Sequence, residues 1–329
     1  MAQRLHVDSI RVAFNDGKHN AFTDLCWFRG HIYLTFRSCP DGHGIFPTSR
    51  IAVMSSADGR EWRRVFDFGV RDRDVRDPHF LVFRDTLFVY TGTWLCDPAL
   101  PQRRDMNDHL GYGAWSRDGE AWDGPQSLEG TYGHYVWRAA ACGGRAYLCG
   151  RRKRDFAHWV GGEGRPAITQ SALLESEDGL VWRTAGLFAE TDGNETAFLF
   201  EDDGALLSIV RGSGASPAQV CTSRPPYKRW TRVPLDRYIG GPLLVKWAGR
   251  CLVGGRKLIE PKNPKTTLYW LANDRLEEVA ELPSGGDNSY PGFVPFSDTH
   301  GLLSYYSSHE GSGSHLPPSA IYLADLRLG

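Results

Sequence analysis

The chain has 329 residues, a length that fits about two average domains or one large repeat fold. Its charges are balanced, with 38 Lys and Arg against 39 Asp and Glu and a net charge of -1, so the basic surface that binds a phosphate backbone is missing and a nucleic-acid partner is not expected. The 37 glycines and 11 tryptophans, beside only 3 methionines, favour many short strands over long helices.

Membrane, secretory and cofactor signals are missing from the sequence. No run approaches the roughly 20 apolar residues that cross a bilayer, and residues 1–8 contain no apolar leader, so we expect a cytoplasmic protein without a membrane partner. The 7 cysteines form no C-x-x-C pair, which argues against disulfides and a thiolate zinc site. No H-E-x-x-H motif or glycine-rich phosphate loop occurs, so no metal or other cofactor is expected. The sequence gives no indication of the oligomeric state.

The predicted elements form a repeat. After a first strand within residues 4–14, each unit contains an apolar strand, a Gly or Asp turn, a second apolar strand and a longer polar connection. The units span residues 22–70, 75–128, 134–190, 194–235, 239–283 and 289–325. From Asp24 to Tyr290, five intervals average about 53 residues, close to the roughly 40–50 of a four-stranded propeller blade. We therefore predict an all-β protein, one six-bladed β-propeller domain over residues 1–329, in which the first strand completes the last blade and leaves no open edge.

One motif, S-x-D-G-x-x-W, recurs with a period of 60 residues. It occurs at residues 56–62, 116–122 and 176–182. In such a turn the aspartate accepts backbone N–H groups, the glycine takes a positive φ, and the tryptophan packs beneath the next strand. These aspartates are therefore structural, and we expect Trp62, Trp122 and Trp182 to be largely buried, on the face opposite the functional site.

Propeller geometry brings the starts of the innermost strands and the loops after the second strands to one face. These segments carry carboxylates, arginines, histidines and tyrosines in every blade, which indicates a site at the axial mouth. The residues expected there are Asp24, Arg37, Asp41, His43, Arg76, Asp77, Tyr135, Arg151, Glu195, Arg211, Arg256, Tyr290, Tyr305 and His309.

The repeated turns resemble the Asp boxes (BNR repeats) of the sialidase, or neuraminidase, superfamily, and the segment from Asn194-Glu195 to Arg211 resembles a sialidase segment in which an arginine follows Asn-Glu after two strands. The resemblance implies a six-bladed propeller that hydrolyses glycosidic bonds, with Tyr290 as the nucleophile and Glu195 as its base. It also implies that Arg211 and Arg256 hold the carboxylate of an acidic sugar. A tyrosine suits this chemistry because a carboxylate nucleophile would be repelled by the carboxylate of the sugar.

The chain departs from the sialidase pattern at its first blade. Sialidases have Phe-Arg-Ile-Pro there, and this chain has Phe22-Thr-Asp-Leu25, so the first arginine of the triad is missing. Arg37 or Arg76 is the candidate replacement, and we expect Arg37, Arg211 and Arg256 to converge on one anion position. The proton donor to the leaving group remains open among Asp77, Asp24, Asp41 and His43.

Two other functions fit the same residues. Asp24, Asp77 and Glu195 resemble the three acids of five-bladed furanosidases, which suggests a glycosidase or polysaccharide lyase that uses carboxylates. A noncatalytic propeller that binds a glycan or a protein is the third reading, because propellers host unrelated functions. The remaining candidates for substrate binding are His43, Tyr135, Arg151, Tyr305 and His309, and the expected partner is a carbohydrate substrate.

Overall fold

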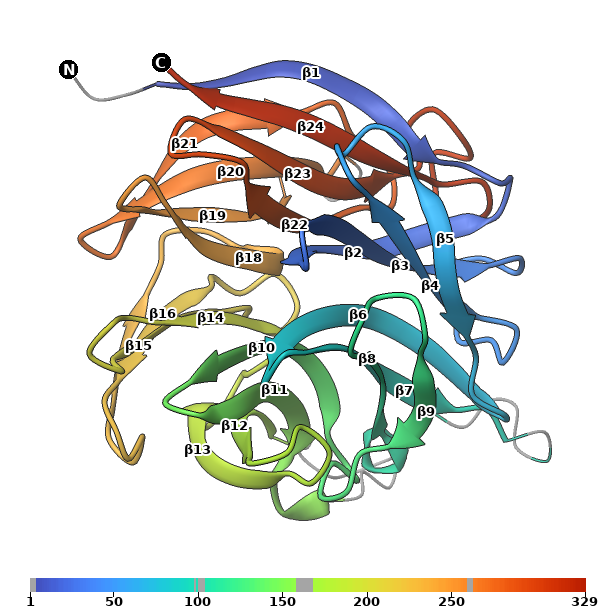
Figure 1. Cartoon of the computed structure of the whole chain (residues 1–329). Coiled ribbons are helices and arrows are strands. Elements are labelled where there is room, and N and C mark those ends of the chain that lie inside the picture. The colour runs from blue at the N-terminus through green and yellow to red at the C-terminus, as the bar shows by residue number, and fades with distance from the viewer. Residues whose placement is uncertain (1–3, 98, 100–103, 158–167, 259–262) are drawn as a thin grey trace.

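The computed structural model describes residues 4–97, 99, 104–157, 168–258 and 263–329. In these residues, six four-stranded antiparallel sheets are arranged in a ring, so the predicted six-bladed β-propeller is confirmed (Figure 1). Two short 3-10 helices, η1 (Met106–Asp108) and η2 (Arg154–Phe156), complete the secondary structure of the described part. No helix there is long and apolar enough to span a membrane.

Within each blade, sequential strands pair from the ring axis outward. The first three blades comprise β2 (His19–Phe28), β3 (His31–Cys39), β4 (Arg50–Ser56) and β5 (Arg63–Phe68); β6 (Arg73–Phe83), β7 (Thr86–Leu95), β8 (Leu110–Ser116) and β9 (Asp123–Ser127); and β10 (Tyr135–Cys142), β11 (Arg145–Lys153), β12 (Thr169–Ser176) and β13 (Arg183–Ala189). The fourth and fifth comprise β14 (Thr196–Phe200), β15 (Leu206–Val210), β16 (Gln219–Ser223) and β17 (Trp230–Pro234); and β18 (Gly240–Trp247), β19 (Arg250–Lys257), β20 (Lys265–Ala272) and β21 (Arg275–Leu282).

The sixth blade joins the two ends of the chain. It consists of β22 (Asn288–Pro295), β23 (His300–Ser307), β24 (Ala320–Leu328) and the N-terminal strand β1 (Leu5–Phe14). β1 pairs with β24 from Leu5 opposite Leu328 to Phe14 opposite Ile321, and the two strands lie side by side in Figure 1. The first strand thus closes the ring as the sequence predicts, and it covers the edge that β24 would otherwise expose.

The repeated Asp turns have the expected local chemistry. Oδ1 of Asp118 accepts hydrogen bonds from the backbone N–H groups of Glu120 and Ala121, at 2.8 and 2.9 Å, and Gly119 has a φ of +86°. Asp58 and Asp178 accept the corresponding pairs of N–H groups. These turns join the two outer strands of their blades, at the opposite face from the starts of the innermost strands.

The tryptophans of these turns are buried unequally. Trp182 is 3% exposed and packs edge-on against Tyr90 of the second blade, with 5.6 Å between ring centroids. Trp62 and Trp122 are partly buried and pack against core clusters, so all three tryptophans contribute to the core but only Trp182 is fully buried. Trp122 stacks on Phe66, which is itself half-buried at the outer strand of the first blade.

Candidate active site

Backbone irregularities mark the innermost strands where they begin. The register of β2, β6 and β22 shifts between Ala21 and Asp24, between Arg76 and His79, and between Ser289 and Gly292. Inside these three shifts, Phe22, Asp77 and Tyr290 have φ values of +61°, +51° and +53°, which side-chain-bearing residues seldom adopt. A bulge re-aims the side chain that it carries, and strain of this kind collects at functional sites.

Tyr290, Glu195 and Arg211 form one hydrogen-bonded group. The Tyr290 hydroxyl donates to Glu195 Oε1 at 3.0 Å. Nη1 of Arg211 lies 3.0 and 2.9 Å from the two Glu195 oxygens and 3.2 Å from the Tyr290 oxygen. Tyr290 and Glu195, the pair that the resemblance singles out, are therefore in direct hydrogen-bonding contact.

The surroundings of Tyr290 and Glu195 shift the pKa values of the two groups in opposite directions. Burial and the negative charge of Glu195 raise the pKa of Tyr290 well above its usual range. Burial opposes ionisation of Glu195 too, but the charges of Arg211 and Arg151 outweigh it and lower the pKa of Glu195. At neutral pH the phenol keeps its proton, and the carboxylate beside it is charged and able to accept that proton.

Asp77 and Tyr135 form a second buried pair. The Tyr135 hydroxyl donates to Asp77 Oδ2, while Asp77 Oδ1 is buried without a hydrogen-bond partner among the described residues. Burial, assisted by the negative charge of Glu195, raises the pKa of Asp77 to about 6, against the lowering effect of Arg76. Of the two carboxyl groups, Asp77 is therefore the one that keeps its proton at mildly acidic pH, whereas Glu195 is charged.

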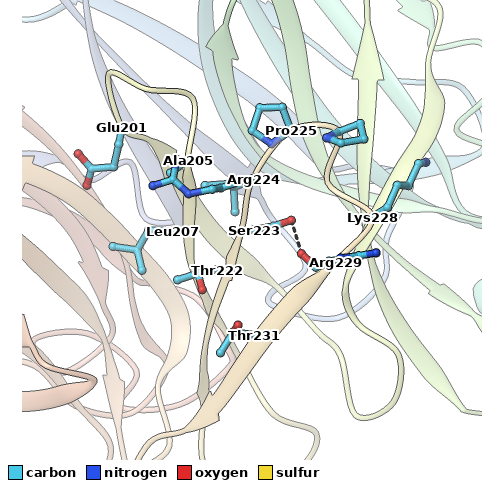
Figure 2. A pocket seen from close by; sticks show the side chains of 12 residues that line it. Glu201, Ala205, Leu207, Thr222, Ser223, Arg224, Pro225, Lys228, Arg229 and Thr231 are labelled. Atoms are coloured by element: carbon cyan, nitrogen blue, oxygen red, sulfur yellow. Dashed lines mark hydrogen bonds between the residues drawn. The ribbon is translucent and has the colours of Figure 1, made fainter.

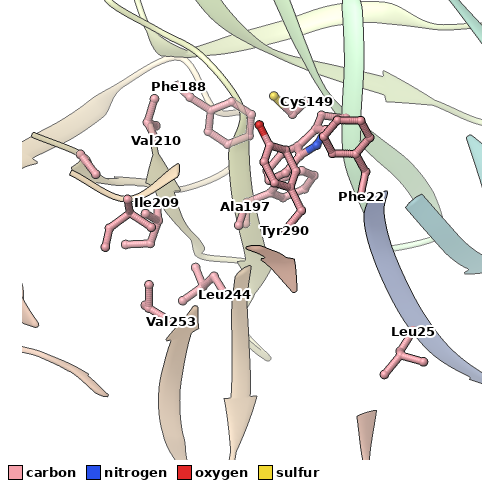
Figure 3. Close-up of a cluster of buried hydrophobic side chains, with 14 of the residues drawn as sticks. Phe22, Leu25, Cys149, Phe188, Ala197, Ile209, Val210, Leu244, Val253 and Tyr290 are labelled. Atoms are coloured by element: carbon pink, nitrogen blue, oxygen red, sulfur yellow. The ribbon is translucent and has the colours of Figure 1, made fainter. Parts of the chain in front are cut away.

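Three arginines surround Tyr290. The guanidinium carbon of Arg256 lies 5.6 Å from the centre of the Tyr290 ring, and Arg211 contacts its hydroxyl. Arg76 lies over Phe22, at 5.5 Å, and the Phe22 ring packs edge-on against Tyr290 with centroids 4.9 Å apart (Figure 3). Of the two candidate replacements for the missing arginine, Arg76 is the one that lies near Tyr290.

These arginines are already paired with carboxylates. Arg76 pairs with Asp74 at 3.0 Å, Arg211 with Glu195, and Arg256 with Asp287 at 3.3 Å. Nη2 of Arg211 and Nη1 of Arg256 nevertheless make no hydrogen bond to any described residue, and both side chains are partly exposed. Because a guanidinium carries five N–H donors, unused donors remain for an anion.

Arg37 does not join this group. Its side chain is fully buried, where Nη2 bonds Asp74 Oδ1 at 2.8 Å and Nη1 and Nη2 donate to the carbonyls of Gly42 and Gly44. The predicted convergence of Arg37, Arg211 and Arg256 is therefore wrong for Arg37, which fixes the loop after β3. The sequence near Arg37 does not predict this ion pair, because Asp74 lies 37 residues further along the chain.

Asp24 lies in a separate axial network. One oxygen accepts the backbone N–H of Phe80 at 3.0 Å, and the other accepts from Arg138 at 3.2 Å. Nδ1 of His79 lies 3.3 Å from the first oxygen. Since Arg138 also bonds the carbonyls of Pro242 and Pro291, the network around Asp24 joins five inner strands, β2, β6, β10, β18 and β22. Asp24 makes no hydrogen bond or ion pair with Tyr290 or Glu195. Asp41 is exposed and hydrogen-bonded to Thr48, so it does not line the site either.

The sixth blade presents Tyr306 to the site in place of Tyr305. Tyr305 stacks on Tyr322 and donates to the Pro283 carbonyl at 3.0 Å, in the core between the fifth and sixth blades. His309 bonds Ser307 and packs beside Tyr322, on the same side as Tyr305. Tyr306 instead reaches Asp287 at 2.8 Å and Arg256 at 3.1 Å. Successive residues of a strand face opposite sides, so a shift of one residue exchanges these roles.

The remaining predicted residues lie around the mouth. The Arg151 guanidinium is 4.9 Å from the centre of the Tyr135 ring and donates to Asn194 at 2.7 Å. His43 is half-buried and packs edge-on against Phe22, with centroids 5.4 Å apart. A different hollow, a groove of about 750 Å³ at the outer strands of the fourth blade, is lined by none of the predicted site residues (Figure 2).

Comparisons with known proteins support the fold. No family model matches the chain, and no curated protein matches its sequence. Among solved structures, a protein of unknown function from Dyadobacter fermentans is similar over 99% of both chains, with a TM-score of 0.80 and 20% identity. Trypanosoma rangeli sialidase in complex with sialic acid matches 99% of this chain and 58% of its own, with a TM-score of 0.66 and 13% identity. The Hadza microbial sialidase Hz136 matches 93% and 65%, with a TM-score of 0.65 and 15% identity.

The chain spans less than two thirds of these two sialidases. At such identities, the likeness establishes a sialidase-like propeller fold and leaves activity to be argued from the site.

Proposed function

We propose that this protein is a glycoside hydrolase that cleaves the glycosidic bond of an acidic sugar, with Tyr290 as the nucleophile. The observation that carries the proposal is the hydrogen bond from the Tyr290 hydroxyl to the charged Glu195, beside Arg211. A phenol with a raised pKa is a poor nucleophile unless a base removes its proton during attack, and Glu195 lies within reach of that proton.

The proposed reaction has two displacements. In the first, the Tyr290 oxygen bonds to the anomeric carbon, Glu195 takes the phenol proton, and the glycosidic C–O bond breaks as Asp77 gives its proton to the leaving oxygen. In the second, water attacks the anomeric carbon, the bond to Tyr290 breaks, and the phenol recovers its proton from Glu195 while Asp77 takes a proton from the water. The pKa of Asp77, raised to about 6, suits such an acid.

An acidic sugar is favoured by the charges around Tyr290. Arg76, Arg211 and Arg256 flank the ring, and two of them keep donors that no described residue uses. A neighbour of the same fold, the trypanosomal sialidase, is known in complex with sialic acid, which is an acidic sugar. The carboxylate-only alternative is weakened because both oxygens of Asp24 are held by structural partners.

A substrate screen tests the proposal. Aryl glycosides of sialic acid, a uronic acid and a neutral hexose, together with acidic oligosaccharides, separate the three functions. A hydrolase releases the phenol or the sugar, a lyase produces the ultraviolet absorbance of an unsaturated uronate, and a binding protein does neither. We expect hydrolysis of an acidic glycoside. A lyase product, or binding without turnover of any glycoside, would contradict the proposal.

A further inference from the structure

Three histidines converge on one carboxylate oxygen where the first and sixth blades meet. His19 begins β2, His43 follows β3, Asp287 precedes β22, and His315 precedes β24. From Asp287 Oδ2, the distances are 2.8 Å to His19 Nε2, 2.6 Å to His43 Nδ1 and 3.4 Å to His315 Nδ1. The ligand atoms of His19, His43 and Asp287 all lie within 4.8 Å of one another.

The other oxygen of Asp287 is held in place by separate partners. Oδ1 accepts from the Tyr306 hydroxyl at 2.8 Å and from Arg256 Nη2 at 3.3 Å, and the backbone N–H of Asp287 donates to Ser308. These bonds fix the carboxylate so that Oδ2 points toward the imidazoles. Hydrogen-bonded outer partners of this kind orient the ligands of protein metal sites.

Hydrogen bonds to Asp287 Oδ2 account for two of the three imidazoles, His19 at 2.8 Å and His43 at 2.6 Å, and leave His315 at 3.4 Å. A carboxylate oxygen has two lone pairs, so three imidazoles cannot all bond it well. With metal–ligand bonds of about 2.0–2.2 Å, neighbouring ligand atoms lie about 3.3–3.6 Å apart around a tetrahedral ion and about 3 Å apart around an octahedral one. The separations of 2.6–3.4 Å between Asp287 Oδ2 and the imidazole nitrogens are close to these values. The nitrogens of His19 and His43 lie within 4.8 Å of each other and would draw together around an ion.

The nearby charges restrict the kind of ion. Arg256 touches Asp287, and Arg37 and Arg76 lie close to His19. Asp74 forms ion pairs with both Arg37 and Arg76 and offsets part of their positive charge. Calcium and magnesium rely on several carboxylate or carbonyl oxygens, and this cluster offers one carboxylate among cations. Imidazole nitrogens are the preferred ligands of zinc, copper, nickel and cobalt ions.

We propose that His19, His43, His315 and Asp287 form a binding site for a divalent transition-metal ion of the zinc class. The ligands come from the first and sixth blades, so the ion would join the two ends of the ring beside the closing strand β1. It would also fix Asp287, which holds Arg256 next to Tyr290. The sequence contains no dense ligand spacing because His19 and Asp287 are 268 residues apart.

The test uses the full-length, tag-free protein after treatment with a chelator, and its readouts need no substrate. Calorimetry with Zn²⁺ should show one site per chain, and saturating Zn²⁺ should raise the melting temperature by several degrees, because an ion that binds only the folded protein stabilises it. Co²⁺ should give visible absorption bands that Zn²⁺ abolishes by competition. Ca²⁺ and Mg²⁺ should produce neither effect.

Variants of the two more exposed ligands identify the site. His43→Ala and His315→Ala should each weaken Zn²⁺ binding by at least about tenfold and remove the Co²⁺ bands, with circular dichroism like that of the wild type. His309→Ala is the matched control, since this loop histidine bonds Ser307 outside the cluster. The proposal is wrong if Zn²⁺ does not bind with one-to-one stoichiometry, if His309→Ala weakens binding as much as the ligand variants do, or if Ca²⁺ binds equally well.

Discussion

At the scale of single residues, the site depends on how buried charges divide their protons. The charges of Arg211 and Arg151 lower the pKa of Glu195, whereas burial and the negative charge of Glu195 raise the pKa of Asp77. A site that contains both a base and an acid requires two carboxyl groups whose pKa values are shifted in opposite directions. The residue types were visible in the sequence, but their protonation depends on partners from other blades.

Loss of the Tyr290 hydroxyl should abolish turnover. Tyr290→Phe keeps the ring that packs on Phe22 and removes the proposed nucleophile, so kcat should fall by at least about a thousandfold with an unchanged melting temperature. Tyr305→Phe is the control, because its hydroxyl bonds a backbone carbonyl away from the site, and its kcat should stay within a fewfold of wild type. Near-normal kcat for Tyr290→Phe would point to a different nucleophile.

Asp77 should impose a pH limit on the reaction. Its pKa is raised to about 6, so the protonated acid is lost as the pH rises through 6, and kcat/KM should decline tenfold per pH unit above that value. Asp77→Asn should remove this decline and should harm substrates with poor leaving groups more than aryl glycosides.

The same shift predicts the sign of a stability change. Folding raises the pKa of Asp77 above its usual value, so this group favours the folded state at low pH and loses that contribution as the pH rises from about 4 to about 6. The melting temperature of Asp77→Asn relative to wild type should therefore be higher at pH 7 than at pH 4. A difference that does not vary with pH would show that Asp77 is not perturbed.

At the scale of elements, the starts of the innermost strands determine where the side chains of the site lie. The Asp turns could be predicted because their chemistry is local and repeats every 60 residues. The register of β23 could not, because nothing local distinguishes Tyr305 from Tyr306, and the choice is made by packing of the strand against Tyr322 and Asp287. Arg37 likewise lies at the end of a second strand, where a substrate-binding arginine is expected. Only the fold shows that its guanidinium group is already bonded to Asp74.

Gly241 should be required for the position of Tyr290. Gly241 has a φ of +57°, and a Cβ added there would lie 2.6 Å from atoms of the Tyr290 ring. Gly241→Ala should displace that ring and reduce kcat by at least about tenfold, since misplacement of a reacting group by about 1 Å is costly.

Gly249 provides the matched control for this substitution. It has a φ of +73°, but an added Cβ meets nothing within 4 Å, so Gly249→Ala introduces backbone strain of about 1 kcal/mol or more without a clash. Its kcat should equal that of wild type. Equal kcat values for the two variants would show that Gly241 has no part in placing Tyr290.

At the scale of the whole molecule, the ring is closed by contacts between distant parts of the chain. The number of blades and the role of the first strand could be predicted from the repeat, because each blade needs four strands and the last unit had three. The pairing of His19 and His43 with Asp287 could not, because these residues meet only after the ring has closed.

Removal of the closing strand should destabilise the entire propeller. Deletion of residues 1–14 leaves the edge of β24 unpaired and uncovers the contacts of Leu5 and Phe14, so the melting temperature should fall by more than about 10 °C and self-association should increase. Val12→Ser, at a half-exposed position of the same strand, should change the melting temperature by less than about 2 °C. Unchanged stability of the deletion variant would contradict ring closure by β1.

The central claim is that Tyr290 attacks the anomeric carbon, and mass spectrometry of a trapped intermediate tests it most directly. A fluorinated acidic glycosyl fluoride should form a covalent adduct slowly enough to isolate, because fluorine beside the anomeric carbon slows the second displacement. Peptide mapping should place the sugar on Tyr290, and Tyr290→Phe should form no adduct. A sugar attached to Glu195 or Asp77 would contradict the tyrosine mechanism, as would turnover of the parent substrate without any adduct.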